Sequence, residues 1–389
     1  MQIGIVGKPN VGKSTFFKAL TLADAEIANF PFTTINPNVG VGYFRTECAC
    51  KEFGVTCNPK NSICVNKNRF IPIKIIDVAG LVPGAHEGKG LGNQFLDDLR
   101  QADALVHIVD ISGKTNEKGE VVASHDPEYD IKFLEEEINL WFFGILKRNW
   151  GKITSKSKYE GSDFVKEVAG QLAGLGINEN QIHQTIREAG LPESADWSDD
   201  QLKEFSFKLR EISKPIIIAA NKIDVDEGNF ERLKDKYRMI PTCSDAELAL
   251  RQADKAGLIE YLAGDSDFKT LKNLDEKQTK ALGFIKEKIL KKFGSTGVQQ
   301  CLNEAATNIL NQIVVYPVEN ENKLSDSKGN VLPDAYLITK GLTAIEMAFK
   351  VHTDLGQKFI GAIDCRTKKK IGKDHELKDG DVIKIIAGR

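Results

Sequence analysis

The sequence predicts an α/β protein with a mostly parallel sheet, a helical insertion and a small C-terminal α+β domain. Short β-branched runs alternate with helical patterns up to about residue 115, which is typical of a sheet covered on both faces. Helical spacing then interrupts this alternation from about Val121 to Lys214. From residue 313 onward, strands that flank one short helix indicate a separate small domain.

The predicted sheet is built from four apolar runs that are rich in isoleucine, valine and leucine. These runs are Ile3–Val6, Ile71–Ile76, Ala104–Asp110 and Ile216–Ala220. A helix is expected from Lys13 to Leu22, directly after the first run. Because the runs are short and apolar on both faces of a strand, we expect them in the buried centre of one sheet.

Two helical regions surround the last of these strands. In the first region apolar residues fall three or four positions apart, and Ser198–Gln201 is a capping box that begins a further helix. The second region runs from about Ala246 to Gln312. The predicted limits are a sheet domain of residues 1–120 and 215–250, a helical insertion of 121–214, a helical segment of 251–312 that completes or flanks the sheet domain, and a C-terminal domain of 313–389.

The C-terminal domain is predicted from apolar runs around one capped helix. Thr343–Glu346 is a capping box for a helix that reaches about His352. The expected strands are Gln312–Val318, Leu332–Leu337 as its hairpin partner, Phe359–Ile363 and Val382–Ile386.

Composition excludes several classes of protein. The chain has 389 residues, of which 41% are hydrophobic and 28% charged, so a largely disordered chain or a disulfide scaffold is excluded. The formal net charge is −2, so any nucleic-acid contact must come from a local patch. The sequence has neither an apolar stretch long enough to span a membrane nor a signal peptide, and we expect a cytoplasmic protein.

A phosphate-binding loop is predicted at Gly7–Ser14, where GKPNVGKS matches G-x-x-x-x-G-K-[ST] between a strand and a helix. Backbone N–H groups of such a loop cradle phosphates at the helix N-terminus. Lys13 would reach the β- and γ-oxygens, and the Ser14 hydroxyl would coordinate Mg²⁺. The expected nucleotide contacts are Lys8, Pro9, Asn10, Val11, Gly12, Lys13, Ser14 and Thr15.

A second phosphate motif, Asp77–Gly80 (DVAG), follows the second predicted strand. The Asp77 carboxylate can hold Mg²⁺ through a water molecule. The Gly80 N–H can contact the γ-phosphate and thereby sense its loss.

A base-reading motif is predicted at Asn221–Asp224 (NKID), at the end of the fourth strand. The Asp224 carboxylate can accept hydrogen bonds from N1–H and the exocyclic amine of guanine, a pair that adenine does not offer. In Thr242–Asp245 (TCSD) a backbone N–H can meet the guanine O6, with a plain loop as the equal alternative. The expected contacts are Asn221, Lys222, Asp224 and Ser244.

Together and in this order, these motifs resemble those of GTPases of the translation-factor-related class. More specifically, the chain resembles the Obg-like family through Asn29–Thr34 (NFPFTT), Asn36–Gly40 (NPNVG) and Asp77–Gly92 (DVAGLVPGAHEGKGLG). Within that family it is similar to the YchF-related branch of archaea and fungi. The resemblance implies a P-loop GTPase domain with a helical insertion, followed by a TGS domain, which is a small β-grasp module.

The resemblance also implies roles for individual residues. Thr34 would supply a second Mg²⁺ ligand when GTP is bound, with Thr33 as the competing choice. Lys13, Thr34 and Gly80 are therefore expected at the reaction centre. YchF proteins carry a glutamate at the last position of the base-reading motif and favour ATP, whereas Asp224 restores the guanine pattern and predicts GTP.

Hydrolysis is predicted to be slow without help, because Leu81 stands where many GTPases place a glutamine that orients water. A partner, a rearranged switch or a cation would complete the site. His86 is a candidate, although a solvated switch residue is the favoured interpretation of it. In some GTPases an asparagine at the position of Asn10 helps to hold K⁺, so K⁺ is a candidate activator here.

A cluster of Cys48, Cys50, Cys57 and Cys64 lies between the first two predicted strands. Four thiolates can form a closed tetrahedral Zn²⁺ site. The spacing differs from the usual paired C-x-x-C knuckle, so reduced thiols and disulfides are alternatives.

The motifs indicate a GTP-binding and GTP-hydrolysing switch that uses Mg²⁺, and the family resemblance implies that it acts on ribosomes or RNA. The basic run Arg366–Lys370 is a candidate contact to a phosphate backbone, with a solvated hairpin as its alternative. Two other functions stay open. One is a nucleotide-gated binding or scaffold protein whose hydrolysis is incidental, and the other is an ATPase like the commoner YchF proteins.

Overall fold

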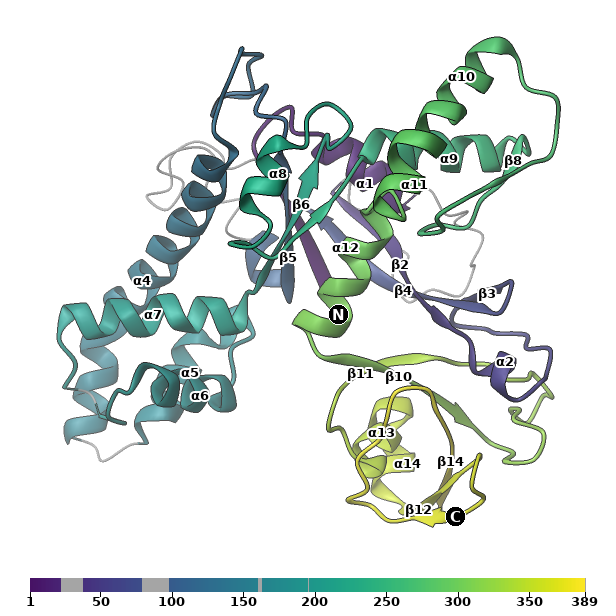
Figure 1. Cartoon of the computed structure of the whole chain (residues 1–389). Coiled ribbons are helices and arrows are strands. Elements are labelled where there is room, and N and C mark those ends of the chain that lie inside the picture. The colour runs from purple at the N-terminus through teal and green to yellow at the C-terminus, as the bar shows by residue number, and fades with distance from the viewer. Residues whose placement is uncertain (22–37, 79–97, 160–162, 195, 389) are drawn as a thin grey trace. The chain divides into compact units, whose positions relative to one another are not determined.

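A computed structural model describes residues 1–21, 38–78, 98–159, 163–194 and 196–388 of the chain (Figure 1). These residues form two compact units. The first unit contains the described residues within 1–20, 36–40 and 74–301, and the second contains those within 21–35, 41–73 and 302–389. None of the helices in this part of the chain combines the length and apolarity that a membrane crossing requires.

A mostly parallel sheet forms the centre of the first unit, with the strand order β2-β4-β1-β5-β6-β7. Its strands are β1 (Gln2–Val6), β2 (Val39–Glu47), β4 (Asn68–Asp77), β5 (Ala104–Asp110), β6 (Ile216–Asn221) and β7 (Met239–Pro241). The boundary between the two units falls within β2 and β4. All four strands that the sequence predicts are therefore present, and β4 begins earlier than expected, at Asn68.

The register of the sheet brings the ends of four strands together. β1 pairs in parallel with β4 on one side and with β5 on the other, and β5 pairs in parallel with β6. Ile5 lies opposite Asp77, and Asp110 lies opposite Asn221. Every residue of β5 is buried, which explains its continuous apolar run. The carboxyl ends of parallel strands share one edge, and ligands of α/β proteins bind outside that edge.

The helical insertion is present and packs against the sheet. Its helices are α4 (Pro127–Tyr159), α5 (Phe164–Leu172), α6 (Glu179–Ala189) and α7 (Asp199–Ser213). The predicted capping box at Ser198 and Gln201 is formed at the start of α7. Leu134 of α4 belongs to the same buried cluster as Val6 of β1 and Leu105 of β5. The insertion therefore shares a core with the sheet.

Further helices follow the insertion, as the sequence predicts. They are α8 (Gly228–Leu233), α9 (Ser244–Lys255), α10 (Glu276–Ile285), α11 (Lys291–Phe293) and α12 (Val298–Glu304), with α1 (Lys13–Thr21) near the start of the chain. A short ribbon of β8 (Ile259–Glu260) and β9 (Lys269–Thr270) separates α9 from α10. Leu250 and Ile285 pack with Ile218 of β6 in one buried cluster.

The second unit contains a five-stranded sheet with the order β11-β10-β14-β12-β13. Its elements are β10 (Gln312–Val318), β11 (Tyr336–Thr339), α13 (Ala344–Val351), α14 (Thr353–Gln357), β12 (Phe359–Asp364), β13 (Lys370–Ile371) and β14 (Asp381–Ala387). β10 and β14 are parallel, and the other neighbours are antiparallel. The capping box of Thr343 and Glu346 begins α13 as predicted.

The cysteine-containing segment also belongs to the second unit. It consists of α2 (Ala49–Glu52), a loop, and β3 (Ile63–Val65), which pairs with β4 in an antiparallel hairpin. The structure thus groups residues 41–73 with the C-terminal sheet, whereas the sequence pattern places them in the sheet domain of residues 1–120.

Candidate nucleotide-binding site

The predicted phosphate loop connects β1 to α1 at the carboxyl edge of the sheet. Gly12 has a φ of 95°, and a Cβ atom there would lie 2.3 Å from Nδ2 of Asn221. A Cβ atom on Gly7 would lie 2.6 Å from the carbonyl oxygen of Ile108. Both positions therefore require glycine, because the loop passes directly against β5 and β6.

Lys13 and Asp77 meet at the start of α1; the sequence predicts a phosphate contact for Lys13 and a water-mediated Mg²⁺ contact for Asp77. Nζ of Lys13 donates to Oδ1 of Asp77 at 2.5 Å and to the carbonyl oxygen of Val78 at 2.9 Å. The two side chains are 18% and 22% exposed, so the pair is accessible from solvent. A triphosphate that binds here would compete with Asp77 for the ammonium group of Lys13.

The donor atoms at this edge fit a magnesium ion. Ser14 is exposed in the first turn of α1, and Asp77 ends the neighbouring strand β4. Hydroxyl and carboxylate oxygens are ligands that Mg²⁺ accepts, usually together with water and phosphate oxygens. When bound, Mg²⁺ neutralises charge that develops on the β- and γ-phosphates.

Asn221 joins three parts of the site. Its Nδ2 donates to the carbonyl oxygen of Val11 at 2.7 Å. Its Oδ1 accepts from the backbone N–H of Ser244 at 3.0 Å and from the Ser244 hydroxyl at 2.9 Å. The sequence indicates direct base contacts for Asn221 and Ser244, and the structure gives each of them an internal partner that fastens β6 to the phosphate loop and to α9.

Lys222 adds a second connection between the base-reading motif and the phosphate loop. Its Nζ donates to the carbonyl oxygen of Asn10 at 2.9 Å and to Oδ2 of Asp110 at 2.8 Å. Burial raises the pKa of Asp110, but hydrogen bonds from Lys222 and Ser112 outweigh it, so the pKa is lowered and the carboxylate stays charged. Sequence reasoning missed Asp110, although a carboxylate that ends a buried strand was a usable signal.

Asp224 is exposed and is oriented by a buried cysteine. The Cys243 thiol donates to Oδ1 of Asp224 at 3.2 Å. Burial, and next the charge of Asp224, raise the pKa of Cys243, so this group stays a neutral donor. The second oxygen of Asp224 has no partner among the described residues. A base could therefore donate to this oxygen without displacing a hydrogen bond from the protein.

The outer half of the phosphate loop is bound to the start of the insertion. Nζ of Lys8 donates to Oδ2 of Asp130 in α4 at 2.7 Å and to the carbonyl oxygen of Thr115 at 2.8 Å. Nδ2 of Asn10 donates to the carbonyl oxygen of Gly119 at 3.0 Å. The amide nitrogen of Asn10 is thus engaged, and its predicted contact with K⁺ stays a prediction.

Several predicted residues lie outside the described part of the chain. They are the switch residues Thr33, Thr34, Gly80, Leu81 and His86. Their roles stay predictions from the sequence.

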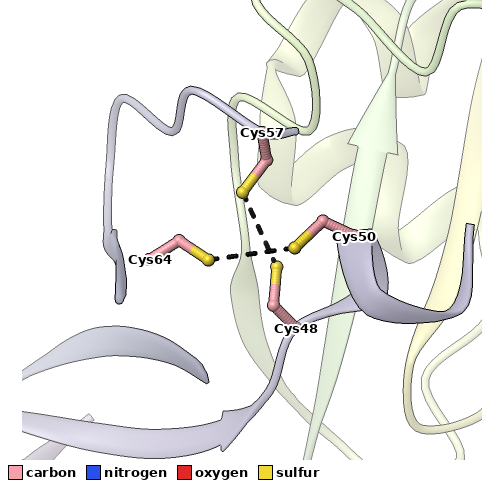
Figure 2. A group of neighbouring side chains, drawn as sticks. All are labelled: Cys48, Cys50, Cys57 and Cys64. Carbon is pink, nitrogen blue, oxygen red and sulfur yellow. Dashed lines mark hydrogen bonds between the residues drawn. The ribbon is translucent and has the colours of Figure 1, made fainter. Parts of the chain in front are cut away.

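The four clustered cysteines converge in the second unit, as Figure 2 shows. Their sulfur atoms all lie within 4.8 Å of one another. Cys48 and Cys57 are 3.9 Å apart at sulfur, as are Cys50 and Cys64. A disulfide requires about 2.05 Å, so the thiols are free in the structure.

Parallel strands, a glycine-dependent phosphate loop and an N-K-x-D motif fastened to it define a P-loop nucleotide-binding protein of the GTPase fold. Comparison with protein families agrees with this class. A model described as 50S ribosome-binding GTPase matches residues 2–137. The G4 motif-containing domain of YGR210-like Obg-like GTPases matches residues 219–320, and the TGS domain matches residues 328–387. The chain belongs to the Obg-like, YchF-related GTP-binding proteins with a C-terminal TGS domain.

Individual relatives cover nearly the whole chain. An uncharacterized GTP-binding protein of Methanocaldococcus jannaschii is 52% identical over 392 residues, which is 99% of each chain. The crystal structure of a GTP binding protein from Pyrococcus horikoshii OT3 superposes with a TM-score of 0.82 at 42% identity and covers 100% of both chains. The ribosome-binding ATPase YchF of Escherichia coli O157:H7 is 28% identical and covers 99% of this chain and 98% of its own.

Proposed function

We propose that the protein is a Mg²⁺-dependent, guanine-selective GTPase that acts as a switch on ribosomes or RNA. The observation that carries the choice of base is Asp224, which is exposed at the end of the N-K-x-D motif and oriented by the Cys243 thiol. A carboxylate can accept two hydrogen bonds from guanine, one from N1–H and one from the exocyclic amine. Adenine offers its exocyclic amine as a donor, but its N1 is an acceptor and would repel the carboxylate. The ATPase function in the name of the E. coli relative is therefore the alternative that the proposal excludes.

In this proposal different residues bind the phosphates, bind Mg²⁺ and contact the γ-phosphate. Loop N–H groups and Lys13 would hold the phosphates, Ser14 and Asp77 would hold Mg²⁺, and Thr34 would complete its ligands. Gly80 would sense the γ-phosphate through its N–H. Because Leu81 cannot orient water, we expect turnover to be slow until a partner or K⁺ completes the site.

A ribosome or RNA target is supported by the names of the matching family and of the E. coli relative. The predicted basic run Arg366–Lys370 and the nearby Lys373 lie in the second unit. Arg366 forms a two-pronged ion pair with Glu52 at 2.5 and 2.7 Å, so its charge is used within the protein. Lys369, Lys370 and Lys373 are exposed and have no ion-pair partner in the described residues, so the RNA contact would be made by these lysines.

Three measurements test the proposal. The first compares GDP with ADP as competitors for a fluorescent guanine nucleotide, and equal competition would contradict guanine selection. The second measures GTP turnover in K⁺ buffer with and without ribosomes from the same source. A large acceleration supports a ribosome-triggered switch, whereas no acceleration favours the nucleotide-gated scaffold. Replacing K⁺ by Na⁺ without a change in rate would remove K⁺ from the mechanism.

A further inference from the structure

The sulfur atoms of Cys48, Cys50, Cys57 and Cys64 have the spacing of a tetrahedral thiolate site. With a Zn–S bond of about 2.3 Å, two sulfurs on one tetrahedron lie about 3.8 Å apart. Two pairs, Cys48 with Cys57 and Cys50 with Cys64, are each 3.9 Å apart at sulfur, and no pair exceeds 4.8 Å. The lines that join these two pairs cross in Figure 2, as opposite edges of a tetrahedron do. This arrangement leaves room for one metal ion and too little for a cluster of several.

A buried positive charge beside the cysteines gives independent support. Arg69 is fully buried, and its Nε donates to Sγ of Cys48 at 3.3 Å. The guanidinium also donates to the Ser62 hydroxyl at 3.0 Å and to the carbonyl oxygen of Leu332 at 3.1 Å. In the described residues no carboxylate forms an ion pair with it, and the carboxylate that its charge influences, Asp334, lies beyond ion-pair distance. An unpaired buried charge is strongly unfavourable, and four thiolates around one divalent ion supply two negative charges beside it.

The same arginine joins the cysteines to the C-terminal sheet. Its guanidinium lies over the Tyr316 ring of β10, 5.3 Å from the ring centre. The segment between Cys57 and Cys64 adds backbone hydrogen bonds. The N–H of Asn58 donates to the carbonyl oxygen of Val331 at 3.1 Å, and the N–H of Lys60 donates to that of Pro333 at 2.7 Å. Asn61 exchanges two hydrogen bonds with Ala335, at 3.0 and 3.1 Å. The cysteine segment is therefore an integral part of the C-terminal unit.

We propose that Cys48, Cys50, Cys57 and Cys64 bind one structural Zn²⁺ ion, and that Arg69 is the internal counter-charge that joins this site to the TGS domain. Four protein ligands close the site, so it has no open position for catalysis. Tetrahedral sulfur ligands select zinc or iron, and divalent zinc binds more tightly than divalent iron to the same ligands. The ion cross-links the two ends of the cysteine segment, which contacts β10 through Arg69 and Tyr316.

The first test measures metal in the full-length chain, purified under reducing conditions, by native mass spectrometry and elemental analysis. We expect one zinc ion per chain. After removal of zinc with a chelator, Co²⁺ should restore the intense visible bands of tetrahedral cobalt thiolate. A chain without metal and with four thiols open to alkylation would overturn the proposal. So would a mass that shows two disulfides, and iron in place of zinc would overturn the choice of metal.

Variants locate the site and test the role of Arg69. Cys57→Ser changes a partly exposed ligand, and we expect zinc to fall from one per chain to none. Cys365→Ser, a buried cysteine of the same unit outside the cluster, is the matched control and should keep one zinc. A far-UV circular dichroism spectrum like that of the wild type, together with retained GDP binding, shows that the loss in Cys57→Ser does not come from general unfolding. Arg69→Met keeps all four ligands and should lose zinc to a chromophoric chelator at least tenfold faster than the wild type; an unchanged rate would remove Arg69 from the proposal.

Discussion

Asn221 at the end of β6 donates from Nδ2 to the carbonyl oxygen of Val11 at 2.7 Å, so the base-reading motif and the phosphate loop are parts of one bonded structure. The same amide accepts two hydrogen bonds from Ser244 at the start of α9. We therefore expect base and phosphate binding to be coupled through these hydrogen bonds. Asn221, which the N-K-x-D motif assigns to ligand binding, also fastens β6 to the phosphate loop and to α9.

Replacing this amide should damage both stability and binding. Asn221→Ala leaves the Val11 carbonyl and the Ser244 N–H buried without partners, and each unsatisfied group costs about 1–3 kcal/mol. We expect the free energy of unfolding to fall by about 2–4 kcal/mol, and GDP affinity to fall with it. Urea denaturation and fluorescent-nucleotide titration measure the two effects. Asn308→Ala, on an exposed helix surface, is the control and should change neither. A stable variant with normal GDP affinity would show that the bonds to Val11 and Ser244 are dispensable.

Asp224 should determine the preference for guanine. Asp224→Asn removes a charged acceptor that is worth about 1.5–3 kcal/mol, so GDP affinity should fall about 10–150-fold while the weak affinity for ADP is unchanged. Asp226→Asn, an exposed neighbour whose carboxylate accepts from Gly228, is the matched control. Competition titrations with both diphosphates give the ratio. Equal losses for GDP and ADP would mean that Asp224 acts on the fold rather than on the base.

Cys243→Ala tests whether the thiol orients Asp224. The variant removes one hydrogen bond from a thiol, which is a weak donor, so the loss of GDP affinity should stay below about tenfold. The effect should vanish in the background of Asp224→Asn, because the carboxylate that the thiol orients is already gone. Equal effects of Cys243→Ala in both backgrounds would assign Cys243 to packing alone. Isothermal titration of GDP against the four proteins completes this cycle.

The core of the fold and the positions of its motifs follow from local patterns. The runs Ile3–Val6 and Ala104–Asp110 are strands because they are apolar on both faces. The helix α7 begins at Asp199 because the side chain of Ser198 caps its N-terminus. The family resemblance assigned the C-terminal β-grasp sheet correctly. Its second strand was predicted at Leu332–Leu337 and lies at Tyr336–Thr339, because pairing with β10 decides the boundary and local apolarity does not.

Contacts between distant residues could not be predicted from one sequence. Nothing in the cysteine segment indicates that Asn58 pairs with Val331 or that Arg69 lies over Tyr316, because these contacts join parts of the chain that are far apart. The bond between Cys243 and Asp224 was equally hidden, since a lone buried cysteine is most often a packing residue.

The ion pair of Lys8 and Asp130 should couple the phosphate loop to the helical insertion. The two side chains are only 10% and 7% exposed, so removing one partner leaves a nearly buried charge. Asp130→Asn should therefore lower the free energy of unfolding by about 3 kcal/mol. The double variant with Lys8→Met should lose less than the sum of the two single losses, with a coupling energy of at least about 1 kcal/mol. The exposed pair Lys280 and Glu276, treated in the same way, should couple by less than about 0.5 kcal/mol. Additive losses for Lys8 and Asp130 would mean that the two charges act independently.

His107 in the centre of β5 should make the protein sensitive to acid. The side chain is buried, and its Nδ1 has no hydrogen-bond partner within the described part of the chain. Burial, and to a lesser extent the charge of Lys8, lower the pKa of His107 from 6.5 to about 3. Between these two values the unfolded chain binds a proton that the folded chain does not. The free energy of unfolding therefore falls as the pH drops from 6.5 toward 3, by up to about 1.4 kcal/mol per pH unit.

Urea denaturation at pH 7 and pH 5 measures this effect, because most carboxylates stay ionised over that interval. We expect the wild type to lose up to about 2 kcal/mol between the two pH values. His107→Gln cannot take up the proton in either state, so its loss over the same interval should be smaller by that amount. His352→Gln, at an exposed histidine of the second unit, is the control and should behave like the wild type. If His107→Gln shows the full pH dependence of the wild type, the acid sensitivity arises from another group and His107 is already accommodated as a cation in the folded chain.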